Sequence, residues 1–516
     1  MEQRELIKTD VPGFDLLLGG GIPTRQAMVI CGNPGSGKTV LGSQIAFAQA
    51  AMGKNVVAAT LTSEPHLKLL DDLRGFSWFD ESKVSSNIFL LSAYPSLKKG
   101  PRELRDMLLS SVREHRATFL LLDGLRAIRE LWRDEAKLRE FLYEIGVAMA
   151  AMNCVALYTS EYPIEKLMDL PEATTVDGIV HLSTYAFGAQ RLRRAEVVKL
   201  RGRNHLRGEH SMRINEAGIT MIPRLENLDL TVDRETIAIH DQARPAFDLP
   251  ELDALLHGGL PRKSSTVILG ATGVGKTLLA LHFAAAGAKK GEPTMFVSFN
   301  EHQDELSRRA KGIGLDIDPL LASGKLVMRH QLPIELDVDD WAAQTLRELR
   351  DRKATRLVVD SLGDLLHAVT DQNRSNNFLV AMGEQLRRLG VTTVFSKEIP
   401  KISHIELDFT EQMMPVAGEN LLMLRHVELS GRIHRVLSTL KMRASPHDWH
   451  VREFVIDDKG FRVLDPIQSV EGLLTGSARQ QDRTISIDSH TKGAIHASSG
   501  SAGAASQAKD LDPKKG

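Results

Sequence analysis

The stretch CGNPGSGKTVL occupies residues 31–41, and a similar stretch, LGATGVGKTLL, occupies residues 269–279. Both fit the spacing G-x-x-x-x-G-K-[ST], in which glycines let backbone N–H groups at a helix N-terminus face phosphate oxygens. Each stretch follows a short apolar run typical of a buried strand and precedes a run with helical spacing. Two matches in the same context argue against a chance glycine-rich turn. The sequence therefore predicts two phosphate-binding loops.

All eight residues of each loop are candidate ligands of a bound nucleotide. The lysine would reach the terminal phosphates of ATP, and the threonine would offer its hydroxyl to the accompanying Mg²⁺. The predicted nucleotide-binding residues are Gly32, Asn33, Pro34, Gly35, Ser36, Gly37, Lys38, Thr39, Gly270, Ala271, Thr272, Gly273, Val274, Gly275, Lys276 and Thr277.

The loops belong to a longer duplication. The segment VPGFDLLLGGGIPTRQAMVICGNPGSGKT, from Val11, matches LPELDALLHGGLPRKSSTVILGATGVGKT, from Leu249, at an offset of 238 residues. Further on, TFLLLDGL at 118–125 matches TRLVVDSL at 355–362, at an offset of 237. A period this long indicates tandem domains and not a solenoid of short repeats. We predict a first domain over 1–235 and a second over 236–474, with a tail over 475–516.

Within each half, strand-like and helical patterns alternate. In the first half, the patterns predict strands at 26–32, 55–61 and 118–123 and helices at 39–52 and 103–115. This alternation is typical of a parallel sheet covered by helices on both faces. The tail has almost no large apolar residue, which favours disorder. The predicted fold is α/β, with two tandem P-loop NTPase domains and a disordered C-terminal tail.

An acid at the end of a second buried strand is the expected partner of the loop in holding Mg²⁺. Asp123 closes FLLLD and Asp360 closes RLVVD. With Thr39 and Thr277, these residues are the predicted metal site, directly or through water. The alternative is that each aspartate only caps the following turn.

A carboxylate near the terminal phosphate could orient and deprotonate the nucleophile. Glu64 in LTSEP and Glu301 in SFNEH occupy matching strand ends shortly after the loop helix. Both are predicted to be catalytic. Alternatively, each could be an acid favoured by the dipole at a helix N-terminus.

Composition limits the class of protein. The 516 residues include 65 Lys and Arg against 66 Asp and Glu, so the whole chain carries no charge bias toward nucleic acid or anionic membrane. Only two cysteines occur, Cys31 and Cys154, both in apolar runs, which favours a reducing cytoplasm. The N-terminus has no apolar signal core, and no apolar run reaches membrane-spanning length. The histidines show no metal-ligand spacing, so the predicted cofactors are ATP and Mg²⁺.

The sequence resembles KaiC, a family of RecA-like circadian-clock ATPases, over roughly residues 5–470. The resemblance is carried by the two loops, by the lead-in that both halves share, and by the closing segments VVKLRGRNH and STLKMRASPH. The resemblance implies a two-tiered homohexamer with ATP between neighbouring subunits and slow hydrolysis in each domain. It also implies that the second domain phosphorylates itself on adjacent Ser and Thr residues. A KaiB-like or other signalling protein is the implied partner.

The resemblance also assigns a role to two basic pairs near the domain ends. Lys199 and Arg201 match the pair that reaches a neighbour's terminal phosphate, and Lys441 and Arg443 match it in the second half. A cation supplied across an interface would stabilise charge on the transferring phosphoryl group. The alternative is that these strand-borne residues are simply solvated.

Two departures from the family pattern concern kinase activity. Asn300 stands where the family has a second glutamate, and an amide cannot accept the substrate's proton. In an ungapped alignment, the two phosphoacceptor positions fall on Pro415 and Val416, which have no hydroxyl. Thr410 lies upstream and could replace them only if the local loop ran differently. The tail shows no clear match to the family's regulatory peptide.

Three functions follow as hypotheses. The first is a Mg²⁺-dependent ATPase ring acting in signalling or clock-like regulation. The second is a RecA-like motor on nucleic acid, suggested by the basic stretch at 191–208 but opposed by its lack of interleaved aromatic residues. The third is a nucleotide-switched interaction module, in which slow hydrolysis times partner exchange.

Overall fold

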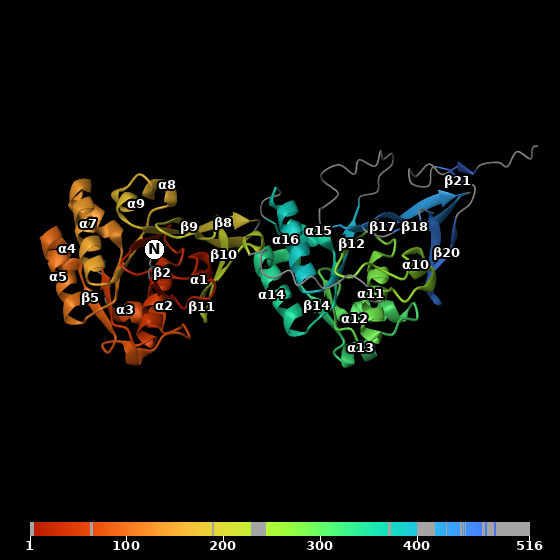
Figure 1. The fold of residues 1–516 in the computed structure, drawn as a ribbon, viewed down its shortest axis with the longest axis horizontal. Coiled ribbons are helices and arrows are strands. Elements are labelled where there is room, and N and C mark those ends of the chain that lie inside the picture. Colours follow the sequence, from red (N-terminus) through yellow and green to blue (C-terminus); the bar gives the residue numbers. More distant parts are fainter. Residues whose placement is uncertain are drawn as a thin grey trace, which may run out of the picture.

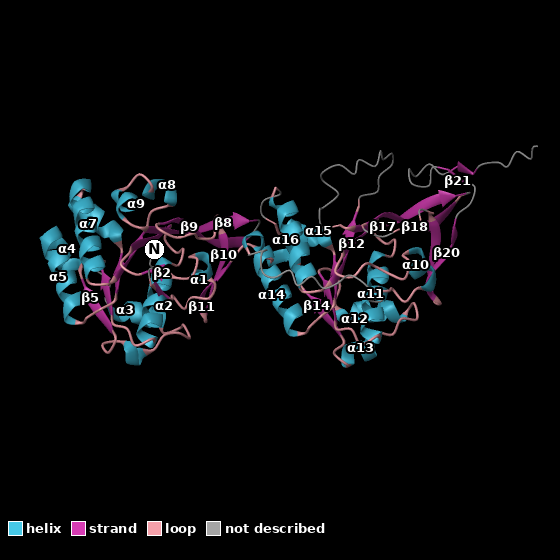
Figure 2. Ribbon diagram, in the orientation of Figure 1, coloured by secondary structure: helices cyan, strands magenta, loops and turns pink. Residues whose placement is uncertain are grey.

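The computed structural model describes residues 5–61, 66–187, 190–228, 244–369, 373–399, 418–429 and 431–443, and further on 446, 448, 450–466, 470–471 and 479–480. Over these ranges the chain forms two lobes side by side, the first coloured red to yellow and the second green to blue (Figure 1). Each lobe is a sheet flanked by helices (Figure 2). The predicted fold class is confirmed.

The elements of the first half are β1 (Leu6–Ile7), α1 (Phe14–Leu17), β2 (Ile22–Pro23), β3 (Ala27–Gly32), α2 (Lys38–Ala51), β4 (Val56–Thr60), α3 (His66–Leu73), η1 (Glu81–Lys83), β5 (Ile88–Ser92), α4 (Tyr94–Lys99), α5 (Pro101–Glu114), β6 (Phe119–Asp123), α6 (Leu125–Trp132), α7 (Glu135–Ala151), β7 (Val155–Ser160), α8 (Ile164–Leu167), α9 (Pro171–Thr175), β8 (Gly178–Phe187), β9 (Gln190–Leu200), β10 (His210–Asn215), β11 (Gly218–Ile222) and η2 (Leu225–Asn227).

The elements of the second half are α10 (Pro250–Leu255), β12 (Ser265–Gly270), α11 (Lys276–Lys289), β13 (Thr294–Ser298), α12 (Gln303–Lys311), α13 (Asp318–Ala322), β14 (Leu326–His330), η3 (Pro333–Glu335), α14 (Val338–Asp351), β15 (Arg356–Asp360), α15 (Leu362–His367), α16 (Arg374–Arg388), β16 (Thr392–Glu398), β17 (Asn420–Leu429), β18 (Arg432–Met442), β19 (Arg452–Asp457), β20 (Gly460–Pro466), β21 (Val470–Glu471) and β22 (Arg479–Gln480).

Each half is built on a nine-stranded sheet with the same topology. The first has the order β11-β10-β9-β8-β3-β7-β6-β4-β5, and the second the order β20-β19-β18-β17-β12-β16-β15-β13-β14. The strands from β8 to β5 are parallel, and β9, β10 and β11 extend the sheet by antiparallel pairing. Because β3 and β12 lie inside the parallel part, the segment after each opens at its carboxyl edge, where α/β sheets bind ligands.

The strands β3 and β6, the latter as far as Asp123, are continuous apolar runs because helices cover both faces of the sheet. In β3, Met28 and Ile30 lie in one core with Leu41 of α2. Val29, on the opposite face, lies in another core with Phe141 of α7. A strand buried on both faces reads as a continuous apolar run instead of alternating. This explains why the sequence predicts these strands well.

The two halves meet through a packed and largely buried junction. Leu225 of η2, in the first half, is buried in a core of the second half that includes Trp341 of α14. Its backbone N–H donates to the Asp339 carboxylate at 3.2 Å. Nearby, Arg194 of β9 is ion-paired with Asp337 just before α14. The first half is thus fixed to the N-terminal end of α14.

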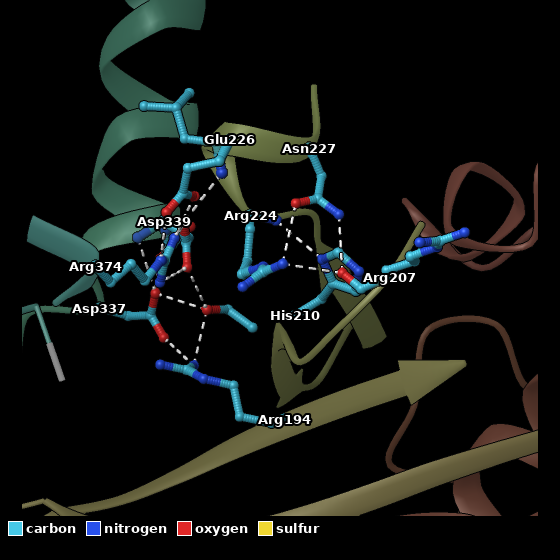
Figure 3. A network of polar contacts seen from close by, with 12 residues as sticks. Arg194, Arg207, His210, Arg224, Glu226, Asn227, Asp337, Asp339 and Arg374 are labelled. Carbon is cyan, nitrogen blue, oxygen red and sulfur yellow. Dashed lines mark hydrogen bonds and ion pairs between the residues drawn. The ribbon is translucent and has the colours of Figure 1, made fainter. Parts of the chain in front are cut away.

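Arg374 is the central cation of this junction (Figure 3). Its guanidinium donates to both carboxylate oxygens of Glu226, at 2.6 and 2.7 Å, and to both oxygens of Asp339. The side chains of Arg374 and Asp339 are 11% and 1% exposed. One planar cation therefore joins an acid from each half, a geometry that arginine provides and lysine does not.

Arg374→Met is expected to destabilise the protein by about 3–5 kcal/mol, because Glu226 and Asp339 would remain buried without their shared cation. Urea unfolding would measure the loss. Arg352→Met removes an ion pair with Glu348 on an exposed helix face and serves as the control, with an expected loss of about 1 kcal/mol or less. Equal losses for the two variants would contradict this account of the junction.

Several expectations concern residues that the structure does not describe. The predicted boundary between 235 and 236 lies outside the described residues. In the predicted tail, the described residues are Arg479–Gln480, which pair with Val470–Glu471. Among the helices of the described ranges, none combines the length and apolar character needed to span a bilayer.

Candidate nucleotide sites

Both predicted phosphate loops connect the central strand of a sheet to a helix, β3 to α2 and β12 to α11. The residue before each helix is a glycine, Gly37 with φ 102° and Gly275 with φ 118°. Residues other than glycine rarely adopt a backbone conformation with such a positive φ. A Cβ there would also lie 2.7 or 2.6 Å from the tip of an isoleucine. Only glycine lets the backbone turn toward a ligand at these points.

The loop lysines point back across their own loops. Lys38 Nζ donates to Asn33 O at 3.0 Å. Lys276 Nζ donates to Gly270 O at 3.0 Å and Ala271 O at 2.9 Å. Burial lowers the pKa of both ammonium groups. A bound phosphate would favour their charged forms, so the loop geometry and its electrostatics both fit a phosphorylated ligand.

The first candidate metal site gathers hydroxyls around a buried carboxylate. Thr39 Oγ1 donates to Asp123 Oδ2 at 3.2 Å, and Thr159 Oγ1 donates to Asp123 Oδ1. Burial raises the pKa of Asp123, although both hydroxyls and the charge of Lys38 oppose the shift. A divalent cation would compensate the desolvated charge, and oxygen ligands are those that Mg²⁺ prefers. Asp123 and Thr39 therefore fit the predicted metal.

The second half repeats the arrangement. Asp360 accepts from Thr277 Oγ1 at 2.8 Å and from Ser396 Oγ, and burial raises its pKa. The hydroxyls of Thr159 and Ser396 were not predicted. They stand at equivalent positions on β7 and β16, 237 residues apart like the aspartates that they contact. A hydroxyl repeated at this offset was the available sequence signal.

Each site contains a second acid that sequence reasoning missed. Glu161 follows β7. Its negative charge raises the pKa of Lys38 and so offsets part of the lowering that burial causes. Glu398 ends β16, accepts from Thr272 Oγ1 of the second loop and acts in the same way on Lys276. These acids are also 237 residues apart. Their negative charge beside the loop would repel a bound polyphosphate, and a cation would offset that repulsion.

The candidate base is described in the second half only, because Glu64 lies outside the described residues. Glu301 follows β13, and its backbone N–H donates to Ser298 Oγ at 3.0 Å. One carboxylate oxygen of Glu301 accepts from Arg309, and the other is buried with no hydrogen-bond partner among the described residues. Burial is the main cause of the raised pKa of Asp360, and the negative charge of Glu301 raises it further. Glu301 thus lies near the candidate metal site.

The first basic pair lies at the end of the sheet away from its own loop. The backbone N–H of Arg201 donates to Asp177 O, and that of Asp177 donates to Ala27 O, which places Arg201 level with the first residue of β3. The loop begins beyond Gly32, at the other end of β3, about 16 Å away at the rise of a strand. Lys199 Nζ donates to two carbonyls of the α9 region, at 2.9 and 2.7 Å. The Arg201 side chain is 56% exposed.

The second basic pair has the same placement. The backbone N–H of Arg443 donates to Glu419 O, and that of Glu419 donates to the O of Ser265, the first residue of β12. Lys441 Nζ donates to Gly418 O at 3.3 Å, and the Arg443 side chain is 70% exposed. Neither predicted pair is near the phosphate loop of its own domain.

Several cations of the basic stretch at 191–208 make internal contacts. Arg194 is ion-paired with Asp337, and Arg203 donates to Gly19 O at 2.8 Å. Lys199 is turned toward carbonyls of the α9 region. These groups are less available to neutralise a nucleic-acid backbone than the sequence suggests, which weakens the hypothesis of a nucleic-acid motor.

The positions that bear on autophosphorylation, Thr410, Pro415 and Val416, lie outside the described residues, so their interpretation stays a prediction from sequence. Asn300 is described. Its Nδ2 donates to Asp364 Oδ2 at 2.8 Å. The amide thus serves as a donor that ties the loop after β13 to α15.

Comparison with known proteins agrees with this geometry. The profile of the family described as "ATPase: KaiC" matches residues 7–226 and 248–468. The circadian clock protein KaiC3 of Synechocystis sp. (strain PCC 6803) is 28% identical over 92% of this chain and 94% of its own. The circadian clock oscillator protein KaiC of Thermostichus vulcanus is 26% identical over 94% of this chain and 93% of its own. With both halves matched and two candidate nucleotide sites of the expected architecture, the chain belongs to the KaiC family of ATPases.

Proposed function

We propose that this chain is a Mg²⁺-dependent ATPase that assembles into a homohexameric ring with ATP between adjacent copies, and that it acts in signalling or clock-like regulation. The main support is the placement of Arg201 and Arg443. Each lies at the sheet end opposite its own phosphate loop and is largely exposed. In a head-to-tail ring, one copy's sheet end would face the next copy's loop.

The loops, acids and basic pairs have distinct roles in this proposal. The loop backbone and Lys38 or Lys276 bind the phosphates. The threonine and aspartate of each site would hold Mg²⁺, which would supply positive charge to offset that of the phosphates. Glu64 and Glu301 orient water and accept its proton. The neighbour's Lys199 and Arg201, or Lys441 and Arg443, stabilise the charge that develops on the terminal phosphoryl group. The two predicted domains, 1–235 and 236–474, each supply one such site.

We further propose that the second half does not phosphorylate itself at the family's usual pair. Pro415 and Val416 offer no hydroxyl oxygen to accept a phosphoryl group. The relatives carry circadian-clock names, and the resemblance of the sequence to KaiC implies a KaiB-like or other signalling protein as partner. Nucleotide turnover would then time the exchange of that partner.

The catalytic assignment is tested with Glu64→Gln, Glu301→Gln and the double variant. Each single change is expected to remove the turnover of its own half. The double variant should lose about 100-fold or more, because a positioned general base contributes that much. Initial rates of phosphate release measure the loss. Labelled γ-phosphate incorporation, measured in parallel, should be absent from the wild type.

Glu114→Gln, on an exposed part of α5, is the matched control and should leave the rate unchanged. Light scattering with and without Mg-ATP tests assembly and should give the mass of six copies when nucleotide is present. A chain that stays monomeric with Mg-ATP, or a double variant as active as the wild type, would contradict the proposal.

A further inference from the structure

The candidate base of the second half is ion-paired within its own domain. Arg309 of α12 donates from Nη1 to Glu301 Oε1. The side chains of Arg309 and Glu301 are 46% and 27% exposed. The other carboxylate oxygen, Oε2, is buried and has no hydrogen-bond partner among the described residues. In this arrangement one oxygen is occupied by a cation and the other is turned away from solvent.

The backbone around Glu301 is anchored on both sides. Its own N–H donates to Ser298 Oγ at 3.0 Å, and Asn300 Nδ2 donates to Asp364 at 2.8 Å. The next N–H, that of His302, donates to Glu305 in the capping box of α12. With the backbone held in this way, the Glu301 carboxylate changes its direction mainly by side-chain rotation. That rotation requires the contact with Arg309 to open.

A general base needs an oxygen free to accept a proton from water. A guanidinium hydrogen-bonded to the carboxylate occupies one of its acceptor oxygens and competes with the water. We propose that Arg309 is a positioning residue that restrains Glu301, so that ATP hydrolysis in the second half proceeds only when this ion pair opens. The inference rests on the proposed function, because it assumes that Glu301 acts as the base.

The residue equivalent to Arg309 differs between the two halves of the chain. At the offset of 237 residues that relates Glu301 to Glu64, the position of Arg309 corresponds to Asp72. Asp72 lies on the exposed side of α3. A carboxylate there cannot form the same ion pair with another carboxylate. The duplication has therefore kept the candidate base while reversing the charge of the residue eight positions later.

Arg309→Gln in the full chain tests the inference, with Lys38→Ala included so that the second site is measured alone. We expect kcat for ATP hydrolysis to rise about two- to fivefold, with KM nearly unchanged. The rise is small because an exposed ion pair contributes little free energy, and its loss can change a rate only by that factor. Arg309→Lys keeps the cation and should stay close to the parent rate. Arg308→Gln removes the same charge from the same helix turn without touching Glu301 and should have no effect.

A double-variant cycle separates a role through Glu301 from a general effect on α12. In the Glu301→Gln background, Arg309→Gln should leave the residual rate unchanged, because no carboxylate remains to restrain. A rate that Arg309→Gln lowers or leaves unchanged in the Lys38→Ala chain would overturn this inference alone. So would an equal rise in the Glu301→Gln background. Absence of ATP turnover in the wild type would instead overturn the proposed function.

Discussion

Lys38→Ala is expected to remove nucleotide from the first site and to lower its turnover by at least about 100-fold. The reason is that Lys38 is only 6% exposed and places its ammonium across the loop, where phosphate charge would be. Lys276→Ala should do the same to the second site. Binding of a fluorescent ATP analogue would show one nucleotide lost per chain for each single change and both lost in the double variant.

Lys54→Ala is the control for this series, since Lys54 is exposed in the turn that follows α2. It should bind nucleotide like the wild type. Full nucleotide occupancy in the Lys38→Ala, Lys276→Ala double variant would show that the ligand is held elsewhere. That outcome would contradict the assignment of both loops.

Arg201→Glu is expected to lower turnover at the first site about 1,000-fold, the effect of losing a cation that stabilises a transferring phosphoryl group. Binding of ATP to the same copy's loop should persist, because Arg201 lies at the opposite end of β3. Rates are measured in a chain that also carries Lys276→Ala. Arg443→Glu should act equally on the second site when Lys38→Ala silences the first.

Arg191→Glu makes the same change of charge at the exposed start of β9 and is the matched control. It should retain the parent rate. Arg201 is preferred to Lys199 for this test because its contacts with Asp177 and Thr174 O are long, at 3.5 and 3.4 Å. Lys199 donates to two carbonyls of the α9 region at 2.9 and 2.7 Å, so its loss would disturb local structure more. Turnover that survives Arg201→Glu would remove the basic pair from the mechanism.

The sequence predicted the loops, the central strands and the strand-end aspartates because each has a local and repeated signature. β3 and β6 are continuous apolar runs, since both faces of the sheet are covered. The glycines are required by backbone conformation at Gly37 and Gly275. Such features depend on residues close in sequence, and the duplication displays each of them twice.

Other parts of the site depend on residues brought together by folding. Thr159 reaches Asp123 because β7 lies beside β6, a neighbour relation that no local pattern encodes. Glu226 and Arg374 are far apart in sequence, and their contact is set by the packing of η2 on α16. The contact between Glu301 and Arg309 is local in sequence. The position equivalent to Arg309 in the first half is Asp72, so comparison of the two halves could not predict the contact.

We propose that the loop of one copy binds each nucleotide and that the basic pair of the next copy completes the site. Chains with Lys38→Ala and chains with Arg201→Glu, both also carrying Glu301→Gln so that the second loop still binds nucleotide for assembly, are each inactive on this account. Mixed in equal amounts, they should regain about a quarter of the turnover of the Glu301→Gln parent, since a head-to-tail ring then pairs intact loops with intact arginines at that frequency. A mixture no more active than its components would contradict the shared site.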